Sequence, residues 1–298
     1  MPDNRLTSHL TSQASLLSAI HSWEAFLADK GRSPNTIKAF LSDVRLLTNF
    51  LPPDITIGKI GTKDLNRYFE WMEKERDVPC SPKTLARRIT ATKSLFRWLH
   101  QYGVLLVDPA EKVAQRSAIS PLPLVLSSEE YDAVLLAADR HRRGSKPDAR
   151  SYTLVYLLLS TGIKKSETLG LKLEHVELDT PNGPQIFIRY ASPANRYKER
   201  KLVLPDDWIP AYHEYLAQYH PTEQVFPWSP RRLEYLLEDV GNEAGLTKHL
   251  SFDMCRWTCA LKDYRAGEEP DKIRQKLGVS KIQWRELHNK LKQLSGNP

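Results

Sequence analysis

The sequence predicts a mainly α-helical protein of two domains, with a small β-sheet in the second domain. Apolar residues recur at helical spacing in most segments, and Ser-Pro pairs and glycines mark where several of these segments begin and end. A stretch near residue 120 loses this periodicity and gathers serine and proline, which is typical of a linker. The chain's 298 residues are enough for two hydrophobic cores.

Four amphipathic helices account for the first hundred residues. Ser33 and Ser81 each precede a proline and are expected to cap the second and fourth helices, because proline fits a first helical turn. Thr62 is expected to cap the third helix, and Gly31 to end the first. These helices predict an all-helical domain over residues 13–113.

Residues 114–122 form the predicted linker, and residues 123–298 the second domain. Two β-prone segments, QIFIRYA and KERKLVLP, flank the turn-rich SPANRY and predict a β-hairpin. Helical periodicity precedes the hairpin at about 128–142 and 150–160 and in a short helix through about Leu171. Helices are also expected after it, in DDWIPAYHEYLAQYH, SPRRLEYLLEDVGNEAG, SFDMCRWTCALKDYRAG, PDKIRQKLG and SKIQWRELHNKLKQL.

Composition favours a globular protein that stays where it is made. Apolar residues make up 41% of the chain and charged residues 27%, and no apolar run approaches the roughly 20 residues of a membrane span. The first residues, MPDNRLTSHLTSQ, lack the apolar centre of a signal peptide. Three scattered cysteines fit a reducing compartment. We therefore expect a cytoplasmic protein.

The fourth predicted helix carries an unusual concentration of positive charge. The formal net charge of the chain is +7. Residues 81–100 contain five cations and no acid, so this segment alone carries +5. At 100° per residue, Lys83, Arg87, Lys93 and Arg97 share the face opposite the apolar one, and Arg88 lies on the flank. The alternative is an ordinary solvated face, but a face of one sign without acids at i,i+4 repels itself. We therefore expect it to contact the phosphates of a nucleic acid.

Several catalytic and metal-binding patterns do not account for the sequence. The motifs of nucleotide-binding loops, serine hydrolases and zinc peptidases do not occur. His249, Cys255 and Cys259 lie close in sequence and raise the alternative of a metal site. The two cysteines are one turn apart on an apolar helix, so core packing is the favoured interpretation. We expect neither a metal nor another cofactor.

The order of four motifs gives the chain a family resemblance. STGIKKSE, the hairpin segment KERKLVLP, SFDMCRWT and LGVS follow one another at the spacing of tyrosine recombinases of the phage-integrase and Xer type, which the chain resembles over nearly its whole length. The resemblance implies a helical core-binding (SAM-like) domain and a catalytic-type domain that clamp duplex DNA. In that family a tyrosine forms a 3′-phosphotyrosyl link, two arginines and a His or Trp hold the phosphate oxygens, and a hairpin lysine protonates the leaving 5′-oxygen.

The resemblance also identifies the family's pocket positions in this sequence. Glu167 and Arg256 keep the family's residue. The other five positions are changed: Lys164 replaces the first arginine, Asn195 the hairpin lysine, Asp253 and Val279 the two histidines, and His288 the nucleophilic tyrosine. A lysine keeps the charge but loses the two-pronged guanidinium donor. For the hairpin lysine, Arg196 or Lys198 are spatial alternatives.

The favoured hypothesis is a catalytically inactive relative that binds double-stranded DNA and associates with the nucleoid. It would be an accessory or regulatory factor in recombination or integration, or the inactive partner of an active recombinase, with self-association through the last helix as a further option. An active recombinase using His288 or Tyr264 is one alternative, and a scaffold without DNA binding another. The expected DNA contacts are Lys83, Arg87, Lys93, Arg97, Lys164, Lys165, Arg200, Lys201 and Arg256.

Overall fold

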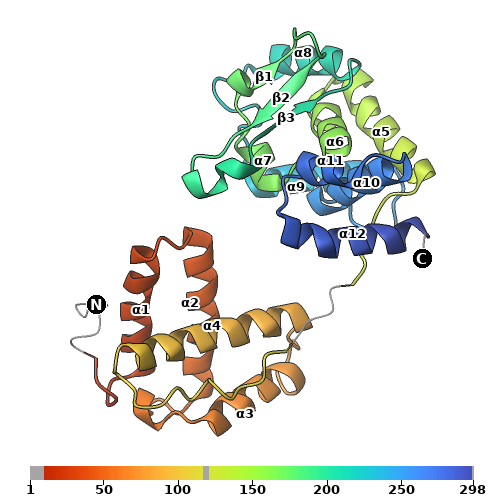
Figure 1. Cartoon of the computed structure of the whole chain (residues 1–298). Helices are drawn as coiled ribbons and strands as arrows, with labels where there is room; N and C mark the ends of the chain where they lie inside the picture. The colour runs from red at the N-terminus through yellow and green to blue at the C-terminus, as the bar shows by residue number, and fades with distance from the viewer. Residues whose placement is uncertain (1–9, 117–120, 297–298) are drawn as a thin grey trace. The chain divides into compact units, whose positions relative to one another are not determined.

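The computed structural model of the chain describes residues 10–116 and 121–296 and divides into two compact units, residues 1–121 and 122–298 (Figure 1). The predicted linker, residues 114–122, falls partly outside the described residues. Both units are mainly helical, and the second also contains a three-stranded sheet. The predicted fold class is confirmed.

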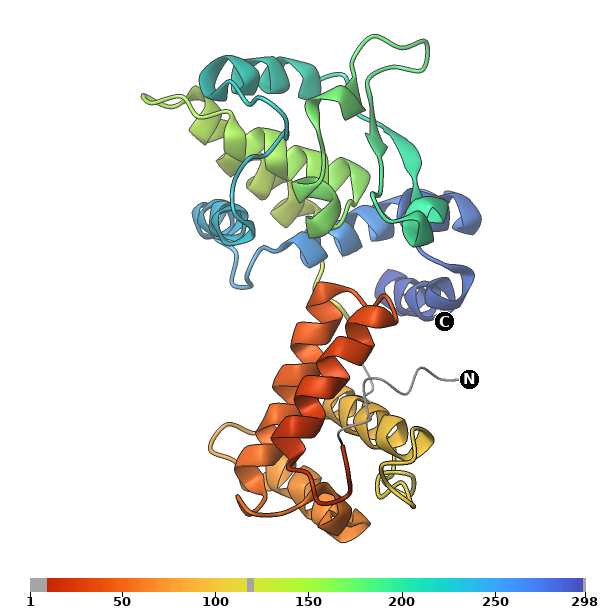
Figure 2. The ribbon, with the colours of Figure 1, turned by 90° about the vertical axis from the view of Figure 1, so that its left-hand side faces the viewer.

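Within residues 10–116, the first unit contains four α-helices and the 3-10 turn η2. Helices α1 and α2 lie side by side, and α4 packs across them (Figures 1 and 2). The bounds are α1 Leu16–Asp29, α2 Pro34–Phe50, η2 Ile57–Lys59, α3 Thr62–Lys74 and α4 Pro82–Gln101.

The helix starts follow from local hydrogen bonding. The hydroxyls of Ser33 and Ser81 accept bonds from backbone N–H groups in the first turns of α2 and α4, as predicted. The prediction for Thr62 is wrong, because the residue lies inside α3 and its hydroxyl donates to the carbonyl of Pro109, 2.7 Å away. The cap position belongs to Gly61, whose N–H donates to the Asp64 carboxylate at 2.8 Å.

Large aromatic side chains fill the core of the first unit. Trp23, Tyr68 and Phe96 are fully buried and come from α1, α3 and α4. The apolar face of α4, with Leu85 and Leu99, points into this core. The polar face of α4, which carries the predicted DNA contacts, is left at the surface or against α2.

The second unit is built around α6, whose residues are buried over almost its whole length. Helices α5, α8, α9 and α10 all pack against it. The bounds are α5 Ser128–Arg143, α6 Arg150–Thr161, α7 Lys165–Leu169, η3 Leu173–His175, α8 Trp208–Tyr219, α9 Pro230–Glu243, α10 Phe252–Arg265, α11 Pro270–Lys276 and α12 Lys281–Ser295.

The sheet has the antiparallel order β1-β2-β3. Its strands are β1 Val176–Glu177, β2 Gln185–Ile188 and β3 Arg200–Val203. The predicted hairpin is confirmed as β2 and β3, with Ile186 opposite Leu202, and its connection contains the 3-10 helix η4, Pro193–Lys198. Strand β1 was not predicted, because two residues are too few for a visible alternation.

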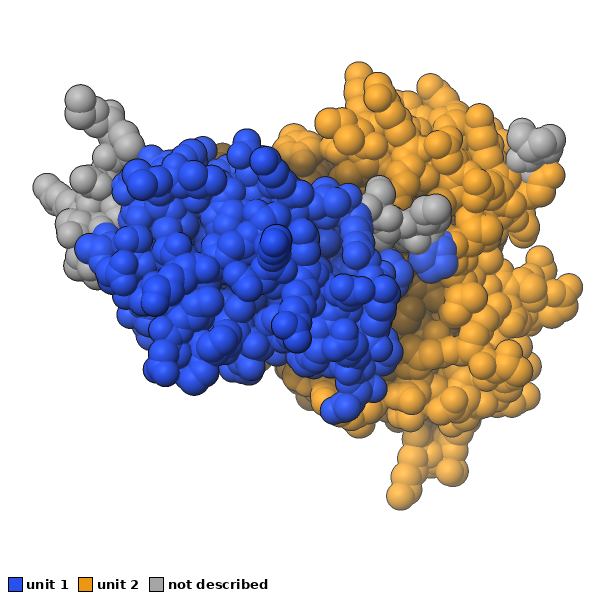
Figure 3. Space-filling view, turned by 90° about the horizontal axis from the view of Figure 1, so that it is seen from below, with its two compact units in different colours: residues 1–121 blue, residues 122–298 orange. Residues whose placement is uncertain are grey.

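A separate hydrophobic cluster joins α10, α11 and α12. Ala260, Leu261, Ile273, Leu277 and Leu291 are its buried members. Figure 3 colours the two units, and each has its own core. No helix of the described residues is long and apolar enough to cross a membrane.

Two of the residues considered as metal ligands lie inside the second unit. Cys255 and Cys259 are both buried and free of disulfides. Burial raises the pKa of the Cys255 thiol to about 12 and that of Cys259 to about 11, which keeps both protonated at neutral pH. These surroundings support the interpretation that the two cysteines pack in the core.

Candidate functional site

The turn after α6 brings the first pocket position into place. Gly162 adopts φ +62°, and a side chain there would lie 3.1 Å from Leu277 and 3.3 Å from Cys259. Only glycine combines this backbone conformation with such close packing. The chain can therefore reverse tightly before α7, whose N-cap residue Lys164 donates its backbone N–H to the Glu167 carboxylate at 2.9 Å.

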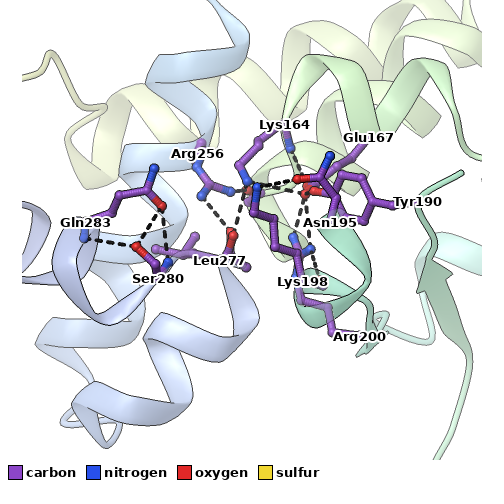
Figure 4. Close-up of polar contacts among 12 residues, drawn as sticks. Lys164, Glu167, Tyr190, Asn195, Lys198, Arg200, Arg256, Leu277, Ser280 and Gln283 are labelled. Carbon is purple, nitrogen blue, oxygen red and sulfur yellow. Dashed lines mark hydrogen bonds and ion pairs between the residues drawn. The ribbon is translucent and has the colours of Figure 1, made fainter. Parts of the chain in front are cut away.

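Glu167 is the centre of the pocket's hydrogen bonding (Figure 4). Arg200 from β3 donates to both of its carboxylate oxygens, at 3.1 and 2.9 Å, and the hydroxyl of Tyr190 donates to one of them. Burial alone would raise the pKa of Glu167, but the bonds from Arg200 and the Lys164 backbone outweigh it and lower the pKa to about 2. Glu167 is therefore ionised at neutral pH.

Arg200 also joins the hairpin to α11. Its Nε donates to the carbonyl of Lys276 at 2.5 Å, and its guanidinium lies against Gly278. A Cβ atom at Gly278 would lie 2.5 Å from Arg200 Nη1, so this position needs glycine for close approach as well as for its φ of +57°. Arg200 was predicted to contact DNA, but its side chain is only 9% exposed and its nitrogens already donate to protein acceptors.

The two cations that stand at the family's arginine positions donate to backbone carbonyls. Lys164 Nζ lies 3.2 Å from the carbonyl oxygen of Gly278 and 3.6 Å from the Glu167 carboxylate. Arg256 on α10 donates to the carbonyls of Gly162 at 2.5 Å and Leu277 at 2.7 Å. Burial lowers the pKa of both groups, and Glu167 opposes the shift in each.

The hairpin places Lys198 beside the residue that replaces the family lysine. Lys198 Nζ donates to Asn195 Oδ1 at 2.8 Å and lies over the rings of Tyr197 and Tyr190. Its charge contributes to lowering the pKa of Lys164, so it faces the same pocket (Figure 4). Arg196 is exposed. Of the two spatial alternatives for the hairpin cation, the geometry favours Lys198.

The remaining three pocket positions carry neither a guanidinium nor an ammonium group. Asp253 is exposed in the first turn of α10 and makes no ion pair with any described residue. Val279 packs into the cluster of α10, α11 and α12. The ring of His288 stacks on Trp284 at a centroid distance of 5.4 Å and meets the edge of Tyr264 at 5.7 Å. Burial and the charge of Lys292 lower the pKa of His288, so the imidazole is neutral at pH 7.

A cavity of about 500 Å³ opens between the hairpin and the start of α12. Its lining includes Lys198, Arg200, Arg274 and Lys281, and its one acid is Glu199. Two other predicted DNA contacts have surface partners: Lys165 pairs with Glu234 at 2.7 Å, and Lys201 pairs with Glu177 at 2.9 Å. Exposed pairs of this kind are weak, so both lysines can exchange partners.

Several cations on the basic face of α4 have protein partners that the local sequence did not indicate. Arg87 donates to both oxygens of Asp43 on α2 at 2.8 Å, and Arg88 lies 3.5 Å from the same carboxylate. Lys93 donates to the carbonyls of Glu111 and Val113. The expectation of five uncompensated cations is therefore wrong, because an acid 44 residues away in sequence packs beside them. Within the described parts of the chain, Lys83 and Arg97 make no ion pair or hydrogen bond through their side chains.

Comparison with known proteins places this geometry in a family. Residues 10–103 match the N-terminal SAM-like domain of phage integrases, and residues 125–287 match the phage integrase family. Two curated relatives are a tyrosine recombinase XerC of Mycobacterium sp. (strain JLS), 30% identical over 54% of each chain, and a tyrosine recombinase XerD of Listeria innocua, 22% identical over 90% of this chain and 92% of the relative. The chain spans about half the length of the first of these.

Solved structures share the fold at low sequence identity. One is a XerH site-specific recombinase bound to palindromic difH substrate, with a TM-score of 0.74, 17% identity and coverage of 94% of this chain and 82% of that one. Another is a lambda integrase tetramer bound to a Holliday junction, with a TM-score of 0.72, 14% identity and coverage of 93% and 78%. With both units matched in order, the chain belongs to the phage integrase family of tyrosine recombinases.

Proposed function

We propose that this protein is a catalytically inactive tyrosine recombinase homologue that binds duplex DNA. It would serve recombination or integration as an accessory or regulatory factor, or as the inactive partner of an active recombinase. The observation that carries the proposal is the environment of His288, which stands at the family's tyrosine position with its ring stacked on Trp284 and in edge contact with Tyr264. A nucleophile must be free to approach the phosphate, and these two ring contacts restrain the imidazole where it lies.

The alternative nucleophile, Tyr264, is no better placed. Its ring belongs to the apolar cluster of α10, α11 and α12, and its hydroxyl makes no hydrogen bond with any described pocket residue. Among the residues that the structure describes, neither side chain makes a hydrogen bond to a group that could take up the proton of an attacking hydroxyl or imidazole. A nicked DNA substrate that traps covalent intermediates should therefore yield no protein–DNA adduct.

The pocket's cations are also poorly available to a transition state. Stabilising a pentavalent phosphorane needs donors aimed at its oxygens. Here Arg256 points two of its donors at the carbonyls of Gly162 and Leu277, and the Lys164 ammonium donates to Gly278. Asp253 would add negative charge beside the phosphate. The cluster supports the attraction of DNA and the packing of the pocket more than the chemistry of strand cleavage.

The first unit supplies the clearest phosphate contacts. Lys83 is exposed near the start of α4 and Arg97 is exposed near its end, and neither has an internal partner among the described residues. Two like charges with no nearby acid favour an anion from outside the protein. Lys93 and Arg87 lie between them on the same face, and Arg87 is half-exposed even while it pairs with Asp43.

The variant Lys83→Gln/Arg97→Gln should weaken the binding of duplex DNA and reduce its salt dependence. Each phosphate contact adds roughly 0.9 to the slope of log K against log salt, so the slope should fall by about 2. The matched control is Lys74→Gln/Arg116→Gln, which removes the same charge from residues already paired with Glu70 and Glu73. Fluorescence anisotropy over a salt series measures the affinity and the salt slope of each variant. A wild-type protein without any salt slope would favour the scaffold alternative over DNA binding.

Assembly through the last helix is part of the proposal. The relatives of known structure include a lambda integrase dimer and a tetramer, each bound to DNA. In this chain the apolar side of α12, with Leu287, Leu291 and Leu294, packs into its own unit. Exchange of α12 with a neighbouring subunit would therefore have to open this packing first. We further propose that DNA binding keeps the protein associated with the nucleoid.

A further inference from the structure

Helix α12 carries a stripe of positive charge that the family pocket does not account for. Lys281, Arg285 and Lys292 follow one another at i, i+4 and i+11, which places them within about 40° on one side of a helix. All three are exposed, and none makes an ion pair or side-chain hydrogen bond with a described residue. Lys290, on another side of α12, instead pairs with Glu286 at 2.9 Å.

The packing of α12 fixes the direction of this stripe. Leu291 is fully buried, and Leu287 and Leu294 pack beside it against α10 and α11 (Figure 1). The helix therefore cannot rotate to bring the cations toward an internal acid. His288 lies on the same side of α12 as the stripe, and the charge of Lys292 contributes to the lowered pKa of its imidazole. The stripe itself lies outside the apolar side of α12.

The stripe continues from the cavity between the hairpin and α12. Lys281 belongs to both, and the cavity also carries Lys198 and Arg200 (Figure 4 shows this end of α12 at Ser280 and Gln283). Lys281 interacts electrostatically with Asp271, but both oxygens of that carboxylate already accept hydrogen bonds from Arg274. The surface thus has an excess of cations from Lys198 to Lys292.

The dimensions of the stripe fit the backbone of a nucleic acid. From Lys281 to Lys292 the helix rises about 16 Å, at 1.5 Å per residue. Phosphates follow each other every 3.4 Å or so along the axis of one strand of duplex DNA, so several lie within that length. Like charges at i,i+4 destabilise an isolated helix, and binding to a polyanion removes that repulsion.

We propose that Lys281, Arg285 and Lys292 form a contact surface for the phosphate backbone of double-stranded DNA, separate from the family's pocket positions. The inference rests on the proposed DNA-binding function. Contacts of this kind position the protein on the duplex without reading its sequence. The surface would therefore raise affinity for all duplexes alike.

The test is the salt dependence of binding of the full chain to a random-sequence duplex. Lys281→Gln/Arg285→Gln/Lys292→Gln should reduce the slope of log K against log salt by about 2 to 3. The control Lys74→Gln/Lys172→Gln/Lys290→Gln removes the same net charge from lysines that are paired with Glu70, Glu223 and Glu286, and should leave the slope within about 1 of the wild type. A variant with Lys281→Arg/Lys292→Arg, which keeps the charges, should retain the full slope.

Each outcome bears on a different claim. If the wild type binds with a salt slope and the stripe variant keeps that slope, the stripe does not contact DNA and the inference is overturned. The same holds if the control variant loses as much slope as the stripe variant, because net charge alone would then explain the effect. A wild type that shows no salt-dependent binding refutes the proposed function itself. Circular dichroism and thermal unfolding of each variant verify that α12 remains folded.

Discussion

Replacing Arg200 by methionine should lower the free energy of unfolding of the second unit by about 3 kcal/mol. Arg200 and Glu167 form a buried pair, with side chains 9% and 1% exposed, and Arg200 also holds the carbonyl of Lys276. Methionine fills similar space but leaves the Glu167 carboxylate in the interior without its main partner. Hydrogen exchange in urea, followed on peptides from residues 122–298, measures the loss.

The control lies next to it on the same strand. Lys201 pairs with Glu177, and both side chains are at least 40% exposed. Lys201→Met should therefore cost under about 1 kcal/mol. Equal losses in the two variants would contradict the role assigned to the buried pair.

The pair of Arg200 and Glu167 also predicts that the free energy of unfolding falls at acid pH. Glu167 has a pKa of about 2 in the folded protein against 4.5 as the ordinary value, so its ionisation stabilises the fold above about pH 4.5. This stabilisation, about 3 kcal/mol from the shift in pKa, is lost as the pH falls from about 5 toward 2. In Arg200→Met the pKa of Glu167 rises, and this acid-dependent loss should shrink. An unchanged pH profile would contradict the account.

The second large effect is expected in the first unit. Asp43 is 2% exposed and lies against Arg87 and Arg88, of which Arg88 is itself only 11% exposed. Asp43→Asn keeps the shape of the side chain but removes the charge that balances both guanidinium groups. The free energy of unfolding of residues 10–116 should fall by about 3 kcal/mol, because a buried cation is left without its anion.

Glu70→Gln is the matched control for this substitution. Glu70 pairs with Lys74 at 2.9 Å, but both side chains are more than half exposed. Its loss should therefore change stability far less than Asp43→Asn does. Hydrogen exchange in urea, followed on peptides of the first unit, separates the two outcomes. If Asp43→Asn unfolds no more easily than Glu70→Gln, the α2–α4 ion pairs do not stabilise the unit.

Local signals in the sequence predicted most helix positions. Ser33-Pro34 and Ser81-Pro82 begin helices where expected, because the capping residue and the first turn lie within a few residues of each other. Thr62 failed as a cap because a competing partner, the carbonyl of Pro109, comes from a distant loop. Helix propensity cannot predict such a contact, because the contact depends on the tertiary fold.

The site was predictable in its positions and much less in its contacts. Motif order identified Lys164, Glu167 and Arg256, and the structure brings all three together with Arg200. No sequence pattern indicates that the carbonyls of Gly162, Leu277 and Gly278 accept bonds from these cations. Asp43, which neutralises part of the basic face of α4, is equally distant in sequence. Pairings of this range depend on the packing of whole helices.

The central claim is that the chain binds DNA without cutting it, and trapping a covalent intermediate tests this most directly. Duplexes that the protein itself selects from a random pool are prepared with a nick that prevents religation, incubated with it and separated on a denaturing gel. We expect DNA binding in the native gel and no covalent adduct in the denaturing one. An adduct that disappears in His288→Ala or in Tyr264→Phe would contradict the account and show an active recombinase with a different nucleophile.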